Sequence, residues 1–465
     1  MVNPMKSISF FGASGTVTGS CYQLNKNYEP YFLIDFGMYQ GTKEVESLNR
    51  VPVPFQPSKL KAVLLTHAHL DHCGRLPMLY QMGYKGKIYM TEPTLDLMGI
   101  VLHDAAKIAR ESEDTIPLYT EDEVDYVMEQ AEIIEYDQTF HLDGFDITYR
   151  DAGHIMGAAS IELNDTHTTT QTRKIVFSGD IGNWPHNMMS DPYLFTEEDV
   201  VVMESTYGGR MHPHEDTKEL MQKEVNAIEL SGGALLIPAF AIERTQEVLY
   251  LLKQLKDSAK IKAQTPIFLD SPMGIHTTEV YLRYGALYND NFHDVISRGN
   301  PFEFTGLHVL ERKKQGHAIE AVHGPKVIIA GSGMMTGGRI VSHAVQYLPI
   351  TSTRILFVGY QGEETMGRAI EEGAQSIRIN DQNVSIRATV SRIDSLSAHA
   401  DESQLLKWLK PIQGVHQVFL THGEDTARDA LEQAILANVG DMTIKKPQRN
   451  DEVLLKLNSR SYPEL

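Results

Sequence analysis

Residues 61–77, KAVLLTHAHLDHCGRLP, carry the pattern that decides the fold. The apolar run at residues 62–65 has the character of a short strand and is too short to form a helix of its own. Four polar side chains follow it within six residues, namely His67, His69, Asp71 and His72. Neutral imidazole nitrogen and carboxylate oxygen are ligands that suit zinc. The stretch therefore predicts a metal site at the end of a buried strand.

The spacing of these residues predicts two ions rather than one. Side chains two apart in an extended segment point the same way, so His67 and His69 are expected to share one ion. Asp71 and His72 fall in the first turn of the next helix and are expected to face a second ion. A histidine-rich surface loop, or a set of core histidines with satisfied hydrogen bonds, is the alternative. That alternative suits a lone histidine better than the pattern H-x-H-x-D-H directly after a strand.

The overall composition is that of an ordinary globular protein. The 465 residues are 42% hydrophobic and 22% charged, and their number suggests two or three domains. With only two cysteines, Cys21 and Cys73, a disulfide framework is excluded and a reducing compartment is favoured. The sequence has no apolar run of about 18 residues to span a bilayer, and its first residues lack the apolar segment of a signal peptide. We therefore expect a cytoplasmic protein with no membrane partner.

The net charge of −19 bears on the choice of partner. Proteins that bind nucleic acid usually contact its phosphates through Lys and Arg. Metal ions and a few local arginines can nevertheless make one groove positive on an acidic protein. The charge thus argues mildly against nucleic-acid binding and does not exclude it.

Further polar side chains recur at the ends of apolar strands. The strand in FLIDFG ends at Asp35, a carboxylate suited to supporting a metal-binding histidine. His154 lies between two glycines in the turn DAGHIMG, and Asp180 follows the strand of KIVFSGDIG, where a carboxylate can bridge two cations. Three later segments, VVMESTYGGR, SAHAD and VFLTHGE, repeat the arrangement with Glu204, His399 and His422.

From about residue 216 to about residue 381 the periodicity changes. Amphipathic helices alternate there with single apolar strands such as ALLIP, PIFLD, KVIIA and RILFVG. This alternation predicts a parallel sheet that is covered by helices on both faces. The loops PAFAIERTQE, DSPMG, GSGMMTGGR and GYQGEETMGR follow these strands. Ligands of open α/β sheets bind at the carboxyl ends of strands, so we expect these loops to line one crevice.

The ordered set of motifs resembles the metallo-β-lactamase superfamily and, within it, the β-CASP family. The four superfamily motifs match Asp35, the H-A-H-L-D-H stretch, His154 and Asp180, and the β-CASP motifs A, B and C match Glu204, His399 and His422. That family includes the endonuclease subunit of the cleavage and polyadenylation factor, RNase J, and RNA-cleaving relatives in bacteria and archaea. The resemblance covers nearly the whole chain, because the loops PAFAIERTQE, GSGMMTGGR and GYQGEETMGR also match loops of the β-CASP domain.

The resemblance implies an α/β fold with two parts. One is a metallo-β-lactamase αββα sandwich, and the other is an inserted β-CASP α/β domain with a parallel sheet flanked by helices. The implied boundaries are residues 1–208 for the first part of the metallo-β-lactamase domain, 209–383 for the β-CASP domain, and 384–465 for the C-terminal part of the metallo-β-lactamase domain.

The resemblance also implies two Zn²⁺ ions as cofactors and RNA as the partner. The ligands it assigns are His67, His69 and His154 for one ion, Asp71, His72 and His422 for the other, and Asp180 as the bridge. The reaction it implies is hydrolysis of an RNA phosphodiester that leaves a 3′-hydroxyl and a 5′-phosphate. The implied catalytic residues are Asp71, Asp35 as a support for a ligand, and His399, oriented by Glu204, as the general acid for the 3′ oxygen.

Arginines on the loops of the inserted domain are candidate phosphate contacts, because their planar guanidinium groups suit phosphate. An equal alternative is that each is a structural ion-pair partner. The candidate substrate contacts are Arg244, Ser332, Arg339 and Arg368. Glu243 and Glu364 depart from the family pattern, which often has glycine at these two positions, and both add negative charge to the expected crevice.

Two other classes of function compete with a ribonuclease. A hydrolase of a small ester, thioester or amide on the same fold has no need of an inserted domain of about 170 residues as a second wall. A non-catalytic scaffold subunit for RNA processing would be expected to lose ligands, whereas every ligand position is filled. The sequence leaves open whether cleavage is internal or proceeds from the 5′ end, which RNA is cut, and whether the chain forms a homo-oligomer.

Overall fold

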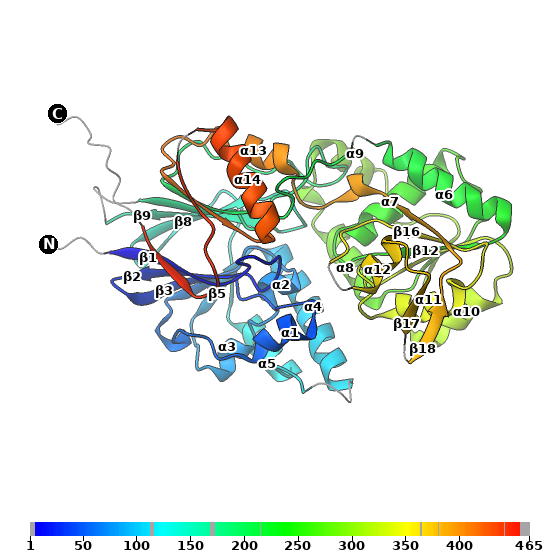
Figure 1. Ribbon diagram of the computed structural model, residues 1–465, viewed down its shortest axis with the longest axis horizontal. Helices are drawn as coiled ribbons and strands as arrows, with labels where there is room; N and C mark the ends of the chain where they lie inside the picture. The colour runs from blue at the N-terminus through cyan, green and yellow to red at the C-terminus, as the bar shows by residue number, and fades with distance from the viewer. Residues whose placement is uncertain are drawn as a thin grey trace. The chain divides into compact units, whose positions relative to one another are not determined.

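The computed structural model describes residues 5–111, 116–167, 173–213, 215–362, 365–379, 381–440 and 442–455. The chain forms two compact units (Figure 1). The first unit combines Met1–Met211 with His399–Leu465, and the second unit is His212–Ala398. The second unit is therefore an insertion in the chain of the first.

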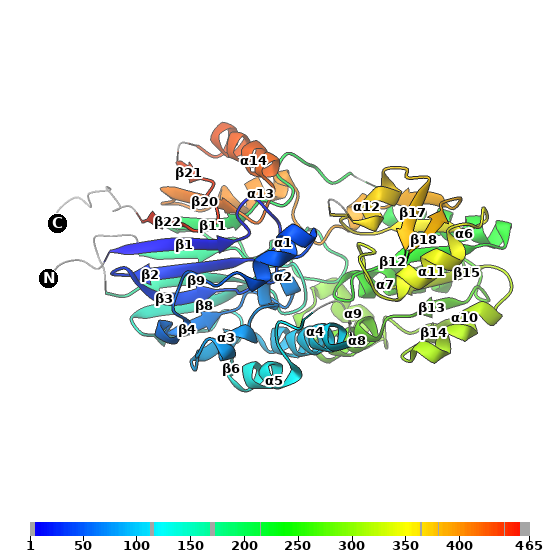
Figure 2. The ribbon, with the colours of Figure 1, turned by 60° about the horizontal axis from the view of Figure 1, so that its bottom comes forward.

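Two seven-stranded sheets form the frame of the first unit, and Figure 2 shows β1 to β4 side by side in one of them. The order in the first sheet is β22 (Asp451–Leu454), β1 (Lys6–Gly12), β2 (Cys21–Lys26), β3 (Glu29–Ile34), β4 (Ala62–Leu64), β5 (Lys87–Met90) and β6 (Ala131–Ile133). The order in the second sheet is β21 (Thr443–Lys445), β20 (Gln417–Thr421), β11 (Val200–Glu204), β10 (Lys174–Phe177), β9 (Ala159–Asp165), β8 (Phe145–Asp151) and β7 (Thr139–Leu142).

Alternate residues of these strands point between the two sheets and form the core of the first unit. Phe32 on β3 and Phe145 on β8 meet across the gap, with 5.4 Å between their ring centres in an edge-to-face arrangement. Phe10 and Phe177 are buried in the same core. The two sheets therefore pack face to face as a sandwich.

Helices cover the outer faces of this sandwich. Trp408 of α13 (Glu402–Leu409) and Leu431 of α14 (Asp425–Asn438) pack with apolar residues of the second sheet. The helix α4 (Glu92–Glu111) contacts β6 and α5 (Glu121–Glu129) beside the first sheet. Three short helices complete this layer: α1 (Lys43–Ser47), α2 (Leu70–Cys73) and α3 (Met78–Gln81). The predicted αββα order is confirmed.

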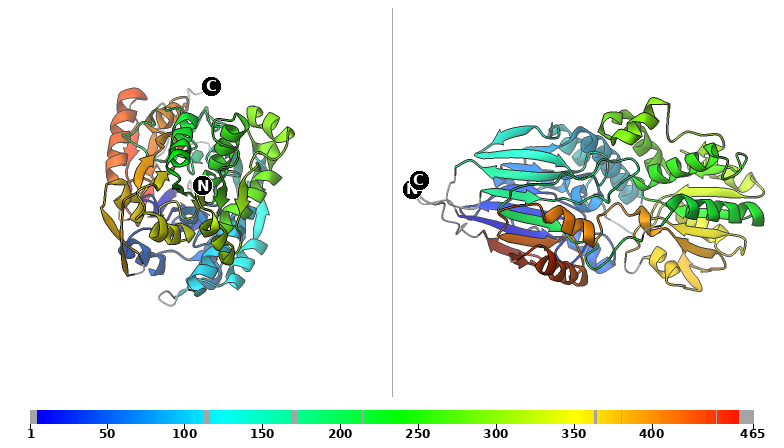
Figure 3. Two further views of the ribbon diagram at one scale, coloured as in Figure 1. Left: turned by 90° about the vertical axis from the view of Figure 1, so that its right-hand side faces the viewer. Right: turned by 90° about the horizontal axis from the view of Figure 1, so that it is seen from above.

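The second unit is built on one parallel sheet of six strands. Its order is β14 (Leu307–Val309), β13 (Ile267–Leu269), β15 (Lys326–Ala330), β12 (Ala234–Pro238), β16 (Arg354–Phe357) and β19 (Thr389–Arg392). A separate hairpin pairs β17 (Ser376–Ile379) with β18 (Gln382–Ser385). The helices around the sheet, seen in Figure 3, are α6 (Thr217–Ser231), α7 (Arg244–Asp257), α8 (Pro272–Arg283), α9 (Asp290–Ser297), α10 (His317–Ala321), α11 (Arg339–Tyr347) and α12 (Met366–Glu371).

Alternation along the central strands explains why this sheet needs helices on both faces. Leu236 and Ile328 point to the face covered by α11, where Ile340 and Ala344 are buried. The intervening residues, such as Leu235, are buried as well, so they face the opposite layer. The predicted parallel sheet covered on both faces is confirmed.

The helix α5 ends at Glu129, and Ala131–Ile133 forms β6 because it pairs in parallel with β5. The second unit extends to Ala398 rather than to residue 383. The reason is that β19 adds in parallel to β16 at the edge of the sheet of the second unit. Among the described residues, none of the helices has the length and apolar character that crossing a membrane requires.

Candidate metal centre

The ligand residues expected from the sequence converge in the first unit, each from a loop at the end of a strand. His67 and His69 follow β4, and Asp71 and His72 lie in the short helix α2. The remaining three ligands come from other loops: His154 after β8, Asp180 after β10 and His422 after β20. Segments that are far apart in the sequence thus bring their side chains together because their strands end at the same edge of the sandwich.

One group of four ligand atoms lies around Asp180. Nδ1 of His69 is 3.2 Å from Nε2 of His67 and 3.1 Å from Nε2 of His154. Oδ2 of Asp180 is 3.4 Å from Nε2 of His67 and 3.6 Å from Nε2 of His154. Ligand atoms of a tetrahedral zinc site with ordinary Zn–N bonds lie about 3.4 Å apart. Three imidazoles and one carboxylate oxygen therefore fit a single zinc ion.

A second group of ligand atoms lies near Oδ1, the other oxygen of the Asp180 carboxylate. Oδ1 of Asp180 is 3.3 Å from Nε2 of His72 and 3.6 Å from Nδ1 of His422. Oδ2 of Asp71 is 3.3 Å from Nε2 of His422. Asp71, His72 and His422 can each offer one atom to this second cluster, and carboxylate oxygen and imidazole nitrogen are donors that suit zinc. Asp180 thus faces one ligand group with each of its two oxygens.

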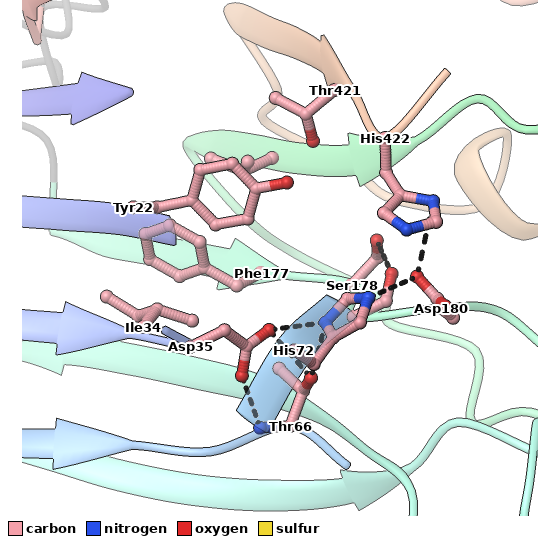
Figure 4. A pocket seen from close by; sticks show the side chains of 12 residues that line it. Tyr22, Ile34, Asp35, Thr66, His72, Phe177, Ser178, Asp180, Thr421 and His422 are labelled. Atoms are coloured by element: carbon pink, nitrogen blue, oxygen red, sulfur yellow. Dashed lines mark hydrogen bonds and ion pairs between the residues drawn. The ribbon is translucent and has the colours of Figure 1, made fainter. Parts of the chain in front are cut away.

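The Asp35 carboxylate supports this arrangement from behind, as Figure 4 shows. Its Oδ1 accepts a hydrogen bond from the backbone N–H of Thr66 at 2.8 Å, and its Oδ2 lies 2.7 Å from Nδ1 of His72. Asp35 is fully buried and has φ of 59°, a left-handed conformation that is uncommon for residues other than glycine. Because Nδ1 of His72 is engaged in this contact, its Nε2 is left to face Asp180 and a metal ion.

A close contact between two loops positions His154 against Asp180. Gly182 approaches the Gly153 backbone so closely that a Cβ on Gly182 would lie 1.9 Å from the Gly153 carbonyl oxygen. The Gly182 N–H donates to the Ala152 carbonyl at 2.8 Å. Only glycine allows this approach, so the motif glycines next to the ligands have a steric function.

Burial sets the protonation of the ligands. Removal from water lowers the pKa of His67 and of His69 to about 3, so both imidazoles are neutral and available as ligands. Burial opposes the ionisation of Asp180, but His422, His72 and His67 hold its pKa well below the usual value. Burial likewise disfavours a charged His72, yet Asp180 and Asp35 raise its pKa well above the usual value. The two carboxylates therefore attract positive charge to the second ligand group, and a metal ion supplies such charge.

His399 occupies a different position from the ligands. Its Nδ1 is 3.1 Å from Oε1 of Glu204, and its Nε2 is 4.0 Å from Oδ2 of Asp180. Glu204 is held in place because the same Oε1 accepts the Ile181 N–H at 2.7 Å. The His399 side chain is 19% exposed, whereas that of His422 is 4% exposed. Burial lowers the pKa of His399, but Glu204 and Asp180 outweigh it and raise this pKa to about 9.

Comparison with known families covers most of the chain. Residues 24–189 match the metallo-β-lactamase superfamily domain, residues 245–370 match the β-CASP domain, and residues 383–446 match the zinc-dependent metallo-hydrolase RNA specificity domain. A ribonuclease of Thermus thermophilus is 37% identical over 419 residues, which cover 89% of this chain and 92% of that protein. The chain belongs to the β-CASP family of the metallo-β-lactamase superfamily. The family predicted from the sequence is confirmed.

Other similar proteins show how far the similarity extends. An RNase J-like protein of Methanocaldococcus jannaschii is 31% identical and covers 90% of this chain and 93% of its own length. The transcription termination factor FttA of Methanosarcina mazei is 30% identical and covers 90% of this chain and 67% of its own length. A crystal structure of a protein of unknown function from Enterococcus faecalis shares the fold, with a TM-score of 0.54, 13% identity, and coverage of 97% of this chain and 100% of that one.

The candidate substrate contacts of the β-CASP domain all have partners within the second unit. Arg244 is buried and pairs with Glu247. Arg339 binds Asp270 at 2.6 Å and also donates to two backbone carbonyls. Arg368 pairs with Glu372 at 2.6 Å, and both side chains are partly exposed. The Ser332 hydroxyl lies 3.2 Å from the Thr336 hydroxyl.

The two departures from the β-CASP loop pattern have different outcomes. Glu243 precedes α7 with φ of 67°, a conformation that favours glycine, and only 1% of the residue is exposed. Its Oε2 accepts a hydrogen bond from the Tyr281 hydroxyl at 2.5 Å. The Glu243 carboxylate is therefore buried and bound to Tyr281 rather than exposed to solvent. Glu364 lies outside the described residues.

Sequence reasoning missed the residues that line a small cavity behind the metal centre. Its volume is about 10 Å³, and Tyr22, Thr66, Ser178 and Thr421 contribute polar groups to the lining. Figure 4 shows Tyr22 and Thr421 above Asp35 and His72 in this view. Thr66, Ser178 and Thr421 lie beside motif residues and Tyr22 lies on β2, and only the folded chain brings the four together around one cavity.

Proposed function

We propose that this protein is a zinc-dependent ribonuclease that hydrolyses RNA phosphodiester bonds with two metal ions. The observation that carries the proposal is the position of Asp180, with one ligand group on each carboxylate oxygen. Two ions that share a ligand and lie about 3.5–4 Å apart form the usual centre of nucleases and phosphatases. The ribonuclease relatives and the RNA specificity domain support RNA as the substrate.

The positions of the donor atoms support an assignment of residues to each ion. His67, His69 and His154 would hold the first ion, Asp71, His72 and His422 the second, and Asp180 both. When bound, the ions supply the acidity that activates water and the positive charge that stabilises the reacting phosphate. The remaining tasks of the reaction fall to side chains of the protein.

Protonation of the departing 3′ oxygen is assigned to His399. Its Nδ1 is engaged with Glu204, so its Nε2 carries the proton toward the reacting phosphate. Glu204 sets the orientation and favours the charged imidazolium, which explains the raised pKa of His399. Hydrolysis with this acid leaves a 3′-hydroxyl on one product and a 5′-phosphate on the other.

The test of this function is RNA cleavage by zinc-loaded protein. RNA labelled separately at its 5′ and 3′ ends should be cut, and the two product ladders distinguish internal cleavage from digestion that starts at the 5′ end. Products should carry a 3′-hydroxyl and a 5′-phosphate. If RNA stays intact while a small ester, thioester or amide is hydrolysed, the protein is not a ribonuclease.

The number of ions has an independent test. Metal analysis of protein prepared with excess zinc should approach two ions per chain, because two clusters of candidate donors lie on either side of the Asp180 carboxylate. A count that stays at one while Asp71, His72 and His422 are intact would contradict the second site. Association of the chain into a homo-oligomer stays a prediction, as does its cytoplasmic location.

A further inference from the structure

A loop next to the general acid has no assigned role. Residues 205–210, STYGGR, follow β11 in the first unit, directly after Glu204. Glu204, which orients His399, immediately precedes this loop. The contacts of the loop show that its position is fixed by the segments that carry both late histidines.

The beginning of the 205–210 loop is tied to the His422 segment. The Ser205 N–H donates to the His422 carbonyl at 3.1 Å, and the Ser205 hydroxyl donates to the Thr421 carbonyl at 2.6 Å. The Thr206 hydroxyl donates to the His422 carbonyl, also at 3.1 Å. These hydrogen bonds therefore hold this part of the loop in a fixed position relative to His422.

The end of the 205–210 loop is tied to the His399 segment. The Gly209 N–H donates to the Glu402 carboxylate at 2.7 Å, and the Glu402 N–H donates to the Arg210 carbonyl at 3.0 Å. Glu402 is the first residue of α13, three positions after His399. Between these two anchors lies Tyr207, a half-buried residue whose ring centre is 6.3 Å from that of His399.

Arg210 differs in its contacts from the three candidate arginines of the second unit. Its side chain is exposed, and no acidic side chain pairs with it in the described part of the chain. Arg244, Arg339 and Arg368 each have an acidic partner. In a protein with a net charge of −19, an exposed arginine on the loop that follows Glu204 is a local source of positive potential.

We propose that the 205–210 loop binds the nucleotide on the 5′ side of the cut, with Tyr207 against its base and Arg210 on a phosphate further upstream. The inference rests on the ribonuclease function proposed above. His399 protonates the 3′ oxygen of this nucleotide, so its ribose must lie beside His399, where the Tyr207 ring is within reach. Aromatic rings bind bases of any sequence, and guanidinium groups bind phosphate. The loop would thus fix the direction in which the RNA strand, from 5′ to 3′, crosses the metal centre.

The test combines changes in the protein with changes in the substrate at the cut site mapped for the parent. Removal of the base directly 5′ of the cut should lower kcat/KM of the parent by about 5- to 150-fold, the range for loss of one stacked base. Tyr207→Leu should show the same loss on intact RNA and no further loss on the RNA without that base. Tyr207→Phe keeps the ring and should resemble the parent. Tyr28→Leu, at a tyrosine that is 67% exposed on the β2–β3 turn, is the matched control.

Arg210 is tested through salt dependence. Arg210→Ala should reduce the slope of log affinity against log salt by about 0.7, one phosphate contact on a single strand, whereas Arg210→Lys should keep the slope. Zinc content and thermal unfolding of all variants should match the parent. If Tyr207→Leu loses activity equally on both RNAs, the loop does not bind the upstream nucleotide. The same conclusion follows if the loss in Tyr207→Leu disappears only on RNA that lacks the base 3′ of the cut. If the parent leaves RNA intact, the ribonuclease function fails and the inference fails with it.

Discussion

Oδ2 of Asp35 lies 2.7 Å from Nδ1 of His72, and both side chains are buried. This contact fixes the ring of His72 so that its second nitrogen faces Asp180. Carboxylates in this position hold a histidine in the orientation and protonation state that a metal requires. A surface pair with similar geometry, His141 and Asp146 at 3.0 Å, offers a matched comparison because it is exposed to solvent.

Asp35→Asn should weaken zinc binding by about 10- to 100-fold, the usual effect of losing such a support. The amide keeps the size of the carboxylate but removes the negative charge that stabilises the His72 contact. Titration with zinc against a competing chelator measures the change. Asp146→Asn should leave zinc affinity unchanged, and equal losses in both variants would contradict a specific role for Asp35.

His422→Ala and His399→Ala should separate metal binding from proton transfer. Loss of a ligand lowers zinc content and, because metal binding is linked to folding, also lowers stability. Loss of a general acid leaves the zinc in place and slows cleavage by about 10²- to 10⁴-fold. Zinc content and cleavage rate of both variants are the measurements. A substrate with a better leaving group should restore His399→Ala in part, and loss of zinc from this variant would show that His399 is a ligand.

Arg339→Ala and Arg368→Ala should have different effects because their contacts differ. Arg339 joins α11 to Asp270 after β13 and to two carbonyls after β14, so its loss should lower the stability of the protein. Arg368 is 36% exposed in a pair with Glu372, and such pairs contribute little to stability. If Arg368 contacts RNA, Arg368→Ala should reduce the salt slope of binding by about 0.7. An unchanged slope together with normal stability would leave Arg368 as a surface residue only.

Glu198→Gln should remove a pH-dependent cost in folding. Burial, with a smaller contribution from Glu162, raises the pKa of Glu198 to about 9. Between its ordinary pKa and about 9, the folded protein retains a proton that the unfolded chain has lost, so stability falls as pH rises through this range. The variant should match the parent near pH 5 and be more stable by about 1–3 kcal/mol near pH 8.5. Urea unfolding at the two pH values measures this, and an equal effect at both would contradict the raised pKa.

The sequence by itself determined the family, and it predicted which residues come together in the candidate metal centre. The ligands are short-range consequences of strand and turn patterns, because each follows an apolar strand that must be buried. Parallel strands end at one edge of a sheet, so side chains that follow them are brought together whatever their distance in the sequence. The alternation of helices and strands likewise predicted the parallel sheet of the second unit.

Only the tertiary structure decided which atoms share a partner. The sequence placed Asp180 beside a strand. That each of its two carboxylate oxygens faces a different ligand group depends on how the loops pack. The edge strand β19 joined the second unit through pairing that no local pattern encodes. The buried partner of Glu243 and the double anchoring of the 205–210 loop are further long-range contacts. Such contacts depend on the relative positions of distant segments, which local propensity does not specify and the packed core fixes.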